Sequence, residues 1–189
     1  MPPMKLNFVA TVLLLLFQQA IDARGKSLKE IVPAGYEILD SVSGNLNDDQ
    51  FNDMILVLKR AKEDSLSPIS DFAIKRETLI LYGDENGYTI VARNMNVVTC
   101  LTCGGMMGDP YTGISISDKT FSVSHYGGSV WRWGRVSTFS RNPGGTWVLS
   151  EDENETFSTE NEERTRETIK TTPKDFGLIT FEQYDFDKE

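Results

Sequence analysis

The sequence predicts an all-β fold of antiparallel sheets with only a few short helical turns. Apolar residues occur in short runs, and many of these runs alternate with polar residues, which is the period of a half-buried strand. Clusters rich in Gly, Asn and Asp separate most of the runs, and such clusters form turns between paired strands. The composition is that of an ordinary globular protein, with 39% hydrophobic and 25% charged residues in a chain of 189.

The first 23 residues have the pattern of a secretory signal peptide. Lys5 precedes an apolar stretch at residues 6–17, and small residues follow at Ala20 and Ala23. The stretch is too short to span a bilayer comfortably. We therefore expect an exported protein, periplasmic or extracellular, with no membrane span once the signal is removed. The alternative interpretation is a buried N-terminal helix.

Residues 24–150 are expected to form the all-β domain. A short helical pattern at residues 27–31 ends before Pro33, because proline disfavours helical geometry in the residue before it. Residues 60–76 form the longest polar insertion, which predicts a loop with a helical turn. Strands are predicted, in chain order, at residues 36–38, 54–58, 78–82, 88–92, 113–116, 120–125, 130–139 and 146–149.

The acidity of the chain is concentrated in its C-terminal segment, residues 151–189. This segment holds thirteen Asp and Glu against five Lys and Arg, so it carries a charge of −8 out of the total of −9. It is expected to be loose over residues 151–170 and to dock through a helical turn at 172–177 and a last strand at 178–181. The alternative is an anionic arm for a basic partner. The acidic balance argues against non-specific nucleic-acid binding.

An Asp- and Asn-rich loop at residues 44–53 leads directly into an apolar strand. Side chains that carry oxygen recur at alternate positions, and calcium takes six to eight oxygen ligands. The alternative interpretation is a polar turn whose Asn and Asp side chains accept hydrogen bonds from their own backbone. The candidate calcium ligands are Asn45, Asn47, Asp49, the backbone of Phe51, and Asp53.

This loop resembles the Gly-Asp-Leu-Asn-Gly-Asp-Gly loop of FG-GAP/VCBS-type repeats, the blades of integrin-α-like propellers. The similarity continues through a second hairpin and covers residues 44–92. It implies a four-stranded blade with calcium in the loop and an adhesive or binding role. Asn45 replaces the first Asp of the family pattern, and Asp48 and Gln50 replace two glycines. Fewer carboxylates predict a weak calcium site.

Cys100 and Cys103 are the only cysteines of the chain. In an exported protein an even pair favours a disulfide, here one that closes a tight ring in a Gly-rich loop. A redox pair would need the first cysteine at a helix N-terminus, whereas glycines follow here. Zinc would need two further ligands, and His125 is the only histidine.

Residues 119–150 contain no Asp or Glu and are rich in aromatic and basic side chains. Alternation along a strand places Trp131 and Trp133 on one face and Arg132 on the other. One interpretation is a hairpin core with buried aromatic residues and arginines at its rim. The other is a surface for a protein or glycan ligand, formed by Tyr126, Trp131, Arg132 and Trp133.

The motifs Cys-Leu-Thr-Cys-Gly-Gly, Gly-Asp-Pro and His-Tyr-Gly-Gly-Ser-Val-Trp-Arg-Trp resemble short secreted bacterial proteins of unassigned function. No phosphate-binding Gly-rich loop, zinc-protease helix or serine nucleophile elbow occurs. The sequence therefore favours an exported, non-enzymatic binding or structural module, which would bind its ligand through the face of Trp131 and Trp133 or through the Gly-rich loop at residues 100–109. Two alternatives stay open: a small periplasmic hydrolase that uses Asp109 and His125, and a periplasmic inhibitor or immunity-like protein.

Overall fold

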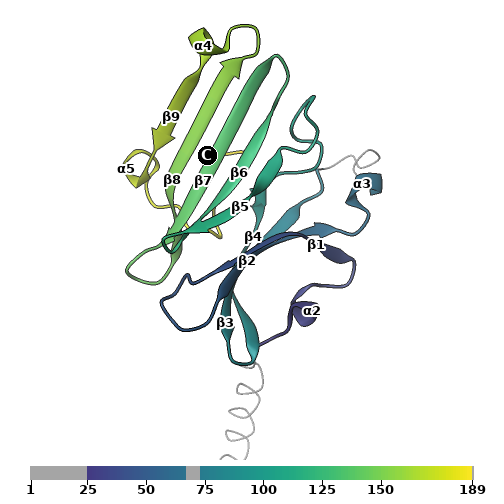
Figure 1. Ribbon diagram of the computed structural model, residues 1–189, viewed down its shortest axis with the longest axis vertical. Helices are drawn as coiled ribbons and strands as arrows, with labels where there is room; N and C mark the ends of the chain where they lie inside the picture. The colour runs from purple at the N-terminus through teal and green to yellow at the C-terminus, as the bar shows by residue number, and fades with distance from the viewer. Residues whose placement is uncertain (1–24, 67–72, 189) are drawn as a thin grey trace, which may run out of the picture.

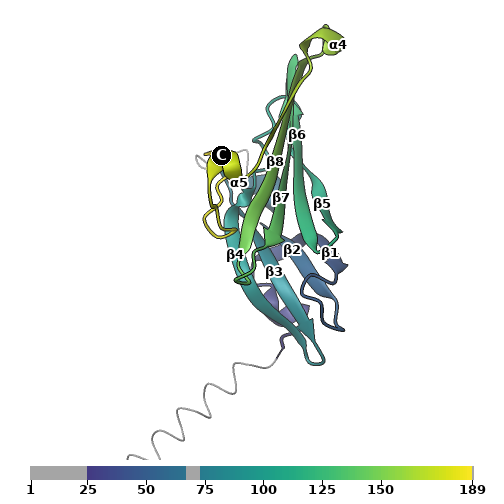
Figure 2. The same cartoon turned by 90° about the vertical axis from the view of Figure 1, so that its left-hand side faces the viewer.

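A computed structural model describes residues 25–66 and 73–188 as two antiparallel β-sheets that face each other (Figures 1 and 2). The predicted all-β fold class is therefore confirmed. The predicted signal peptide lies outside the described residues. Within the described ranges, no helix has the length and apolar character needed to cross a membrane.

The first sheet is a four-stranded meander in which each strand pairs with the next one along the chain. Its strands are β1 (Tyr36–Gly44), β2 (Asp53–Arg60), β3 (Arg76–Asp84) and β4 (Gly87–Val98). The two central strands are apolar on both faces because helix α2 (Leu28–Ile31) covers the side that faces away from the second sheet. The short helix predicted before Pro33 is thus confirmed. A second short helix, α3 (Glu63–Leu66), confirms the helical turn predicted in the polar insertion.

The second sheet has five strands, again in chain order. They are β5 (Tyr111–Ser117), β6 (Thr120–Gly128), β7 (Trp131–Arg141), β8 (Trp147–Ser158) and β9 (Glu167–Thr171). A two-residue turn joins β5 to β6, and both of its residues, Asp118 and Lys119, have positive φ angles. This left-handed turn matches the twist of paired strands.

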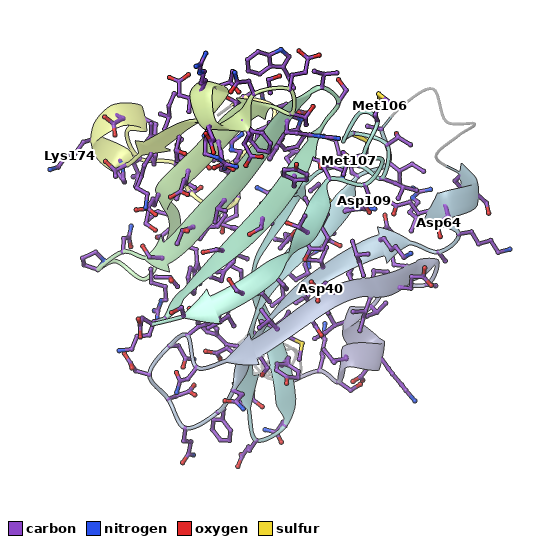
Figure 3. All side chains as sticks on the ribbon, turned by 45° about the horizontal axis from the view of Figure 1, so that its top comes forward. Asp40, Asp64, Met106, Met107, Asp109 and Lys174 are labelled. Atoms are coloured by element: carbon purple, nitrogen blue, oxygen red, sulfur yellow. A yellow bond between two sulfur atoms is a disulfide. The ribbon has the colours of Figure 1, made fainter. Side chains whose placement is uncertain are left out.

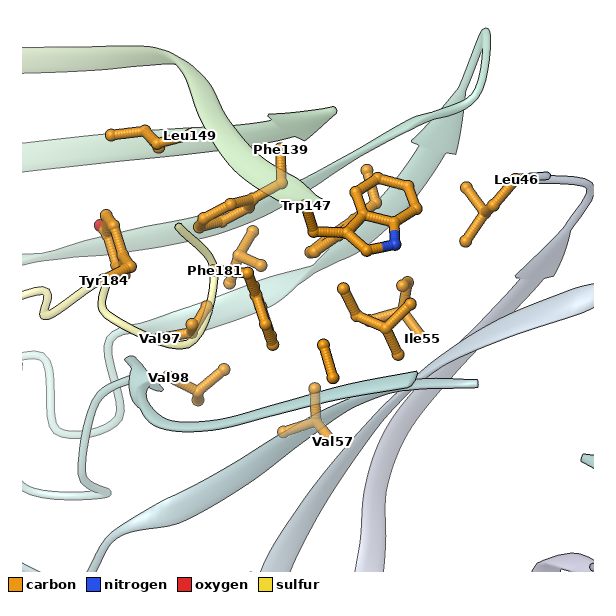
Figure 4. Packing of buried hydrophobic residues seen from close by; sticks show 14 residues of the cluster. Leu46, Ile55, Val57, Val97, Val98, Phe139, Trp147, Leu149, Phe181 and Tyr184 are labelled. Carbon is orange, nitrogen blue, oxygen red and sulfur yellow. The ribbon is translucent and has the colours of Figure 1, made fainter. Parts of the chain in front are cut away.

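The hydrophobic core fills the space between the two sheets (Figure 4). Ile55 and Ile80 come from the first sheet, and Phe121 and Phe139 from the second. The rings of Phe121 and Phe139 stack with their centroids 5.1 Å apart. Residues from the C-terminal segment, including Phe181, complete this core. The segment is therefore part of the packing that holds the two sheets together.

The C-terminal segment is more ordered than the sequence predicts. The boundary placed after residue 150 falls inside β8, and residues 151–171 continue through α4 (Glu162–Thr165) into β9. The expectation of a loose segment is wrong. Residues 151–158 pair with β7 and residues 167–171 pair with β8, so the charged side chains project from the two faces of a sheet. Helix α5 (Pro173–Phe176) confirms the predicted helical turn. The predicted last strand is wrong, since one isolated bridge from Val148 to Thr180 is all that forms there.

Candidate functional site

The Asp- and Asn-rich loop between β1 and β2 closes on its own backbone. The Asn45 side-chain oxygen Oδ1 accepts a hydrogen bond from the Asp48 N–H at 2.8 Å. Asp49 Oδ1 accepts one from the Phe51 N–H at 2.7 Å, and Asn47 Oδ1 accepts one from the Asp49 N–H at 3.0 Å. These contacts are the Asx turns of the alternative interpretation.

Asp53, the last candidate ligand, is buried at the base of this loop. Its Oδ2 accepts a hydrogen bond from the Leu46 N–H at 2.7 Å, and its Oδ1 accepts one from the Gly83 N–H at 3.1 Å. Burial raises the pKa of Asp53, while these two hydrogen bonds oppose the rise. The carboxylate thus joins the loop to β3 and places Leu46 in the core.

The structure brings the five candidate calcium ligands into one loop and its base. Across residues 25–66 and 73–188, no group of three or more His, Cys, Asp or Glu side chains is arranged to hold a metal ion. Calcium binding by oxygen atoms of this loop, which include amide and backbone oxygens, stays a prediction.

The four candidate ligand-binding residues lie on two faces of the second sheet. Burial alternates along β6 with His125 directed inward, so Tyr126 is directed outward, where its ring lies 6.5 Å from that of Phe157. Arg132 pairs with Phe157 in the register of β7 and β8 and shares this outer face. Trp131 and Trp133 occupy the inner face, and the Trp133 ring lies 5.9 Å from that of Phe186.

The expectation that the arginines of this stretch lie at a rim is wrong for Arg135, which is buried. Its Nη2 lies 2.9 Å from Asp152 Oδ2, and its Nη1 donates a hydrogen bond to the Phe186 carbonyl at 2.7 Å. The guanidinium carbon lies 4.7 Å from the centre of the Phe186 ring. Burial is tolerated because a carboxylate, a carbonyl and an aromatic ring replace water around the cation.

Cys100 and Cys103 form the predicted disulfide, with their sulfur atoms 2.11 Å apart. The Gly-rich loop that they close lies against the turn between β6 and β7. The Gly128 N–H donates a hydrogen bond to the Gly104 carbonyl at 2.9 Å. A Cβ atom on Gly127 would lie 2.6 Å from Cζ2 of Trp133, so only glycine allows the indole ring to pack there.

We call the four exposed hydrophobic residues of this loop and of the turn between β6 and β7 the apolar tip. An isolated bridge between Gly105 and Gly128 brings its two chain segments together. Figure 3 shows Met106 and Met107 on the surface beside Asp109. The exposed fractions of its members are 86% for Met106, 46% for Met107, 48% for Val130 and 60% for Trp131. Of these four residues, Trp131 is a predicted ligand-binding residue, Met106 and Met107 lie in the Gly-rich loop that is the alternative predicted binding surface, and Val130 is in neither prediction.

A buried arginine, Arg76, holds both ends of the loop that carries Met106 and Met107. Its Nη1 donates to the Thr99 carbonyl at 3.2 Å, just before the disulfide. The same guanidinium bonds both oxygens of Asp109, at 2.8 and 2.7 Å, just after the loop. Glu63 is fully buried on its other side, with its Oε2 2.8 Å from Nη2. The base of the apolar tip is thereby fixed to β3 and α3.

His125 and Asp109, the residues of the hydrolase alternative, each accept hydrogen bonds from other residues. The Thr99 N–H donates to His125 Nε2 at 3.4 Å. Asp109 accepts hydrogen bonds from Arg76 and, at 3.0 Å, from the Tyr111 N–H. Within the described residues no hydrogen bond joins Asp109 to His125. Burial, and then the positive charge of Arg135, lower the pKa of His125 to about 4. Across residues 25–66 and 73–188, no carboxylate is hydrogen-bonded to the imidazole of His125.

This lowered pKa predicts that acid destabilises the fold through His125. Between pH 4 and 6.5 the unfolded chain binds the proton and the folded chain does not, so the free energy of unfolding rises with pH in this window. The contribution of the full window is about 3 kcal/mol. His125→Phe retains a ring against Tyr111 and Phe186. Urea unfolding at a series of pH values should show a flatter slope for this variant, and an unchanged slope would contradict the prediction.

Comparisons of the chain with family models, with curated proteins and with solved structures find no match. The resemblance of residues 44–92 to FG-GAP/VCBS-type repeats stays a prediction.

Proposed function

We propose that this chain is an exported, non-enzymatic binding module that presents its apolar tip to a protein partner. The observation that carries the proposal is the exposure of Met106, Met107, Val130 and Trp131 on a loop and a turn that the bridge between Gly105 and Gly128 joins. The disulfide and the hydrogen bonds of Arg76 restrain the loop on both sides. Export is supported by the signal pattern of residues 1–23 and by the disulfide, which forms in oxidising compartments.

The chemistry of the tip fits a protein surface. Tryptophan and methionine are enriched at the centres of protein interfaces, where a large apolar side chain fills a pocket of the partner. Methionine adapts its shape to that pocket because its side chain is unbranched and flexible. The restrained base favours binding because less conformational entropy is lost when the partner docks.

A glycan is the alternative ligand, and the tip fits it less well. Sugar recognition combines a flat aromatic ring with polar groups that hydrogen-bond the hydroxyls. The four side chains of the apolar tip carry one polar hydrogen, that of the Trp131 indole. Arg132 donates a hydrogen bond to the Gly128 carbonyl at 3.3 Å, and its side chain lies on the outer face of the sheet, opposite to the face of Trp131.

We expect the double variant Met106→Ser/Trp131→Ala to bind its partner at least about tenfold more weakly than the natural protein. The partner is first captured from the exported protein fraction of the native cells, identified, purified, and then titrated by calorimetry. Leu178→Ala is the matched control, because Leu178 is 72% exposed and lies outside the tip.

The proposal is wrong if the double variant retains full affinity, or if Leu178→Ala weakens binding as much. Protease treatment of the captured material separates the two ligand classes. Binding that survives complete digestion of the partner fraction would assign a glycan and contradict a protein partner.

A further inference from the structure

Strand β9 leaves one edge of the second sheet open. In the described part of the chain, β9 pairs with β8 on one side and with no strand on the other (Figure 1). The corresponding edge of the first sheet, β4, is partly covered, since Tyr88 bonds Lys26 through both of its backbone groups. Residues 167–170 of β9 are exposed, so the backbone groups of its free edge are accessible to another strand.

The free edge lacks the charge that usually protects such edges. A lysine on an edge strand opposes pairing, because its charge would lie beside a second strand. Lys170 is drawn back over β8, where its Nζ lies 2.9 Å from Glu151 and 3.1 Å from Glu153. Its charge is therefore compensated by the strand behind it. On the other face, Ile169 is 52% exposed at the centre of β9.

The sequence of β9 is self-complementary in one antiparallel register. In a two-fold pair, each residue lies opposite the residue of the second copy at the same distance from the axis, and the two opposite side chains share a face. An axis at Ile169 pairs all five residues of the strand without setting like charges opposite each other. The pairs are Ile169 with itself, Thr168 with Lys170, and Glu167 with Thr171.

The neighbouring registers set like charges opposite each other, which is destabilising. An axis at Lys170 brings the two copies of this lysine together, and an axis at Thr168 brings Arg166 opposite Lys170. A shift by a single residue would set side chains of opposite faces against each other, because side chains alternate along a strand. The sequence of β9 therefore favours one register with a second copy, and Ile169 lies at its axis.

We propose that two copies of this chain associate through β9, in an antiparallel pair with Ile169 at the two-fold axis. The five-stranded sheets of the two copies then join into one continuous sheet. Backbone hydrogen bonds along the edge hold the pair, and the two isoleucines cover each other's exposed apolar surface. The paired edge is short, so the dimer is weak and its population depends on protein concentration. This surface is separate from the apolar tip, so the dimer does not depend on the function proposed above.

Sedimentation velocity of the mature protein tests the dimer over concentrations from about 10 µM to about 1 mM, the range in which a weak pair dissociates. The buffer holds about 0.15 M salt, which screens the net negative charges of the two copies. We expect the dimer fraction to rise with concentration and amide hydrogen exchange in residues 167–171 to slow as it rises. A protein that is monomeric at every concentration, or a dimer with unprotected β9 amides, would overturn the proposal.

A pair of charge variants tests the position of the axis. Ile169→Lys and Ile169→Glu each set two like charges opposite each other, and each should weaken self-association at least about tenfold. An equal mixture of the two variants sets opposite charges at the axis, so the dimer should return, and its return also verifies that both variants fold.

The matched control is Leu178→Lys, which introduces the same charge at a side chain that is 72% exposed and lies outside β9. It should leave self-association unchanged. Three results would each contradict the proposal: a mixture of the Ile169 variants that stays monomeric, single Ile169 variants that dimerise like the natural protein, or equal weakening by Leu178→Lys.

Discussion

Replacing Arg76 with leucine is expected to lower the free energy of unfolding by about 4 kcal/mol. The guanidinium is buried and bonds two carboxylates, those of Glu63 and Asp109. Leucine removes the cation and leaves Glu63, which has no exposure to solvent, as an unpaired buried charge. An unpaired charge in this position is far more costly than an absent ion pair.

Urea unfolding followed by circular dichroism measures this loss. Arg93→Leu is the matched control, because the Arg93 side chain is 61% exposed and its ion pair with Glu77 spans 3.3 Å. It should cost less than about 1 kcal/mol. Adding Glu63→Leu to Arg76→Leu should restore part of the stability, since it removes the stranded charge. A loss no larger than that of Arg93→Leu would show that Arg76 does not hold the loop.

Phe181→Ala is expected to lower the free energy of unfolding by about 4 kcal/mol as well. Phe181 is fully buried and packs edge-on against Phe121 and Phe139, with ring centroids 5.7 and 5.3 Å away. Alanine leaves a cavity between the two sheets, because the strands around it cannot close without breaking their pairing.

The control for Phe181→Ala is Leu178→Ala, three residues earlier in the same segment and largely exposed. It should change the free energy of unfolding by less than about 0.5 kcal/mol. Similar losses for the two variants would mean that the C-terminal segment does not complete the core. The packing of Phe181 also determines how the acidic segment should be studied, because deleting residues 151–189 would remove core residues together with the charges. Point substitutions at surface glutamates change the charge and preserve the core.

Most strands could be predicted from local patterns. In β2 and β3 the apolar runs are continuous, and in β6 they alternate, so each strand is visible within its own residues. The second half of β8 was missed because its inward side chains, Asp152 and Asn154, are as polar as its outward glutamates. Such a strand shows no alternation of apolar and polar residues, so its position is determined by its pairing with β7.

The candidate site was predicted only in part. Trp131 stands out in the sequence as an aromatic residue beside a Gly-rich turn. Met106 joins it through the bridge between Gly105 and Gly128, which are far apart along the chain. Arg76 pairs with Glu63 and Asp109 across separations of 13 and 33 residues. No spacing rule connects residues at such separations.

The sequence by itself determined the all-β fold class, three of the four short helices in the described residues, and the disulfide. Each depends on residues close together along the chain, through side-chain alternation, turn chemistry or a short covalent ring. The tertiary structure alone decided which hydrophobic side chains remain exposed at the tip, which arginines are buried and where the acidic segment docks. These properties depend on contacts between segments that are distant in sequence, since burial is set by what the other sheet covers.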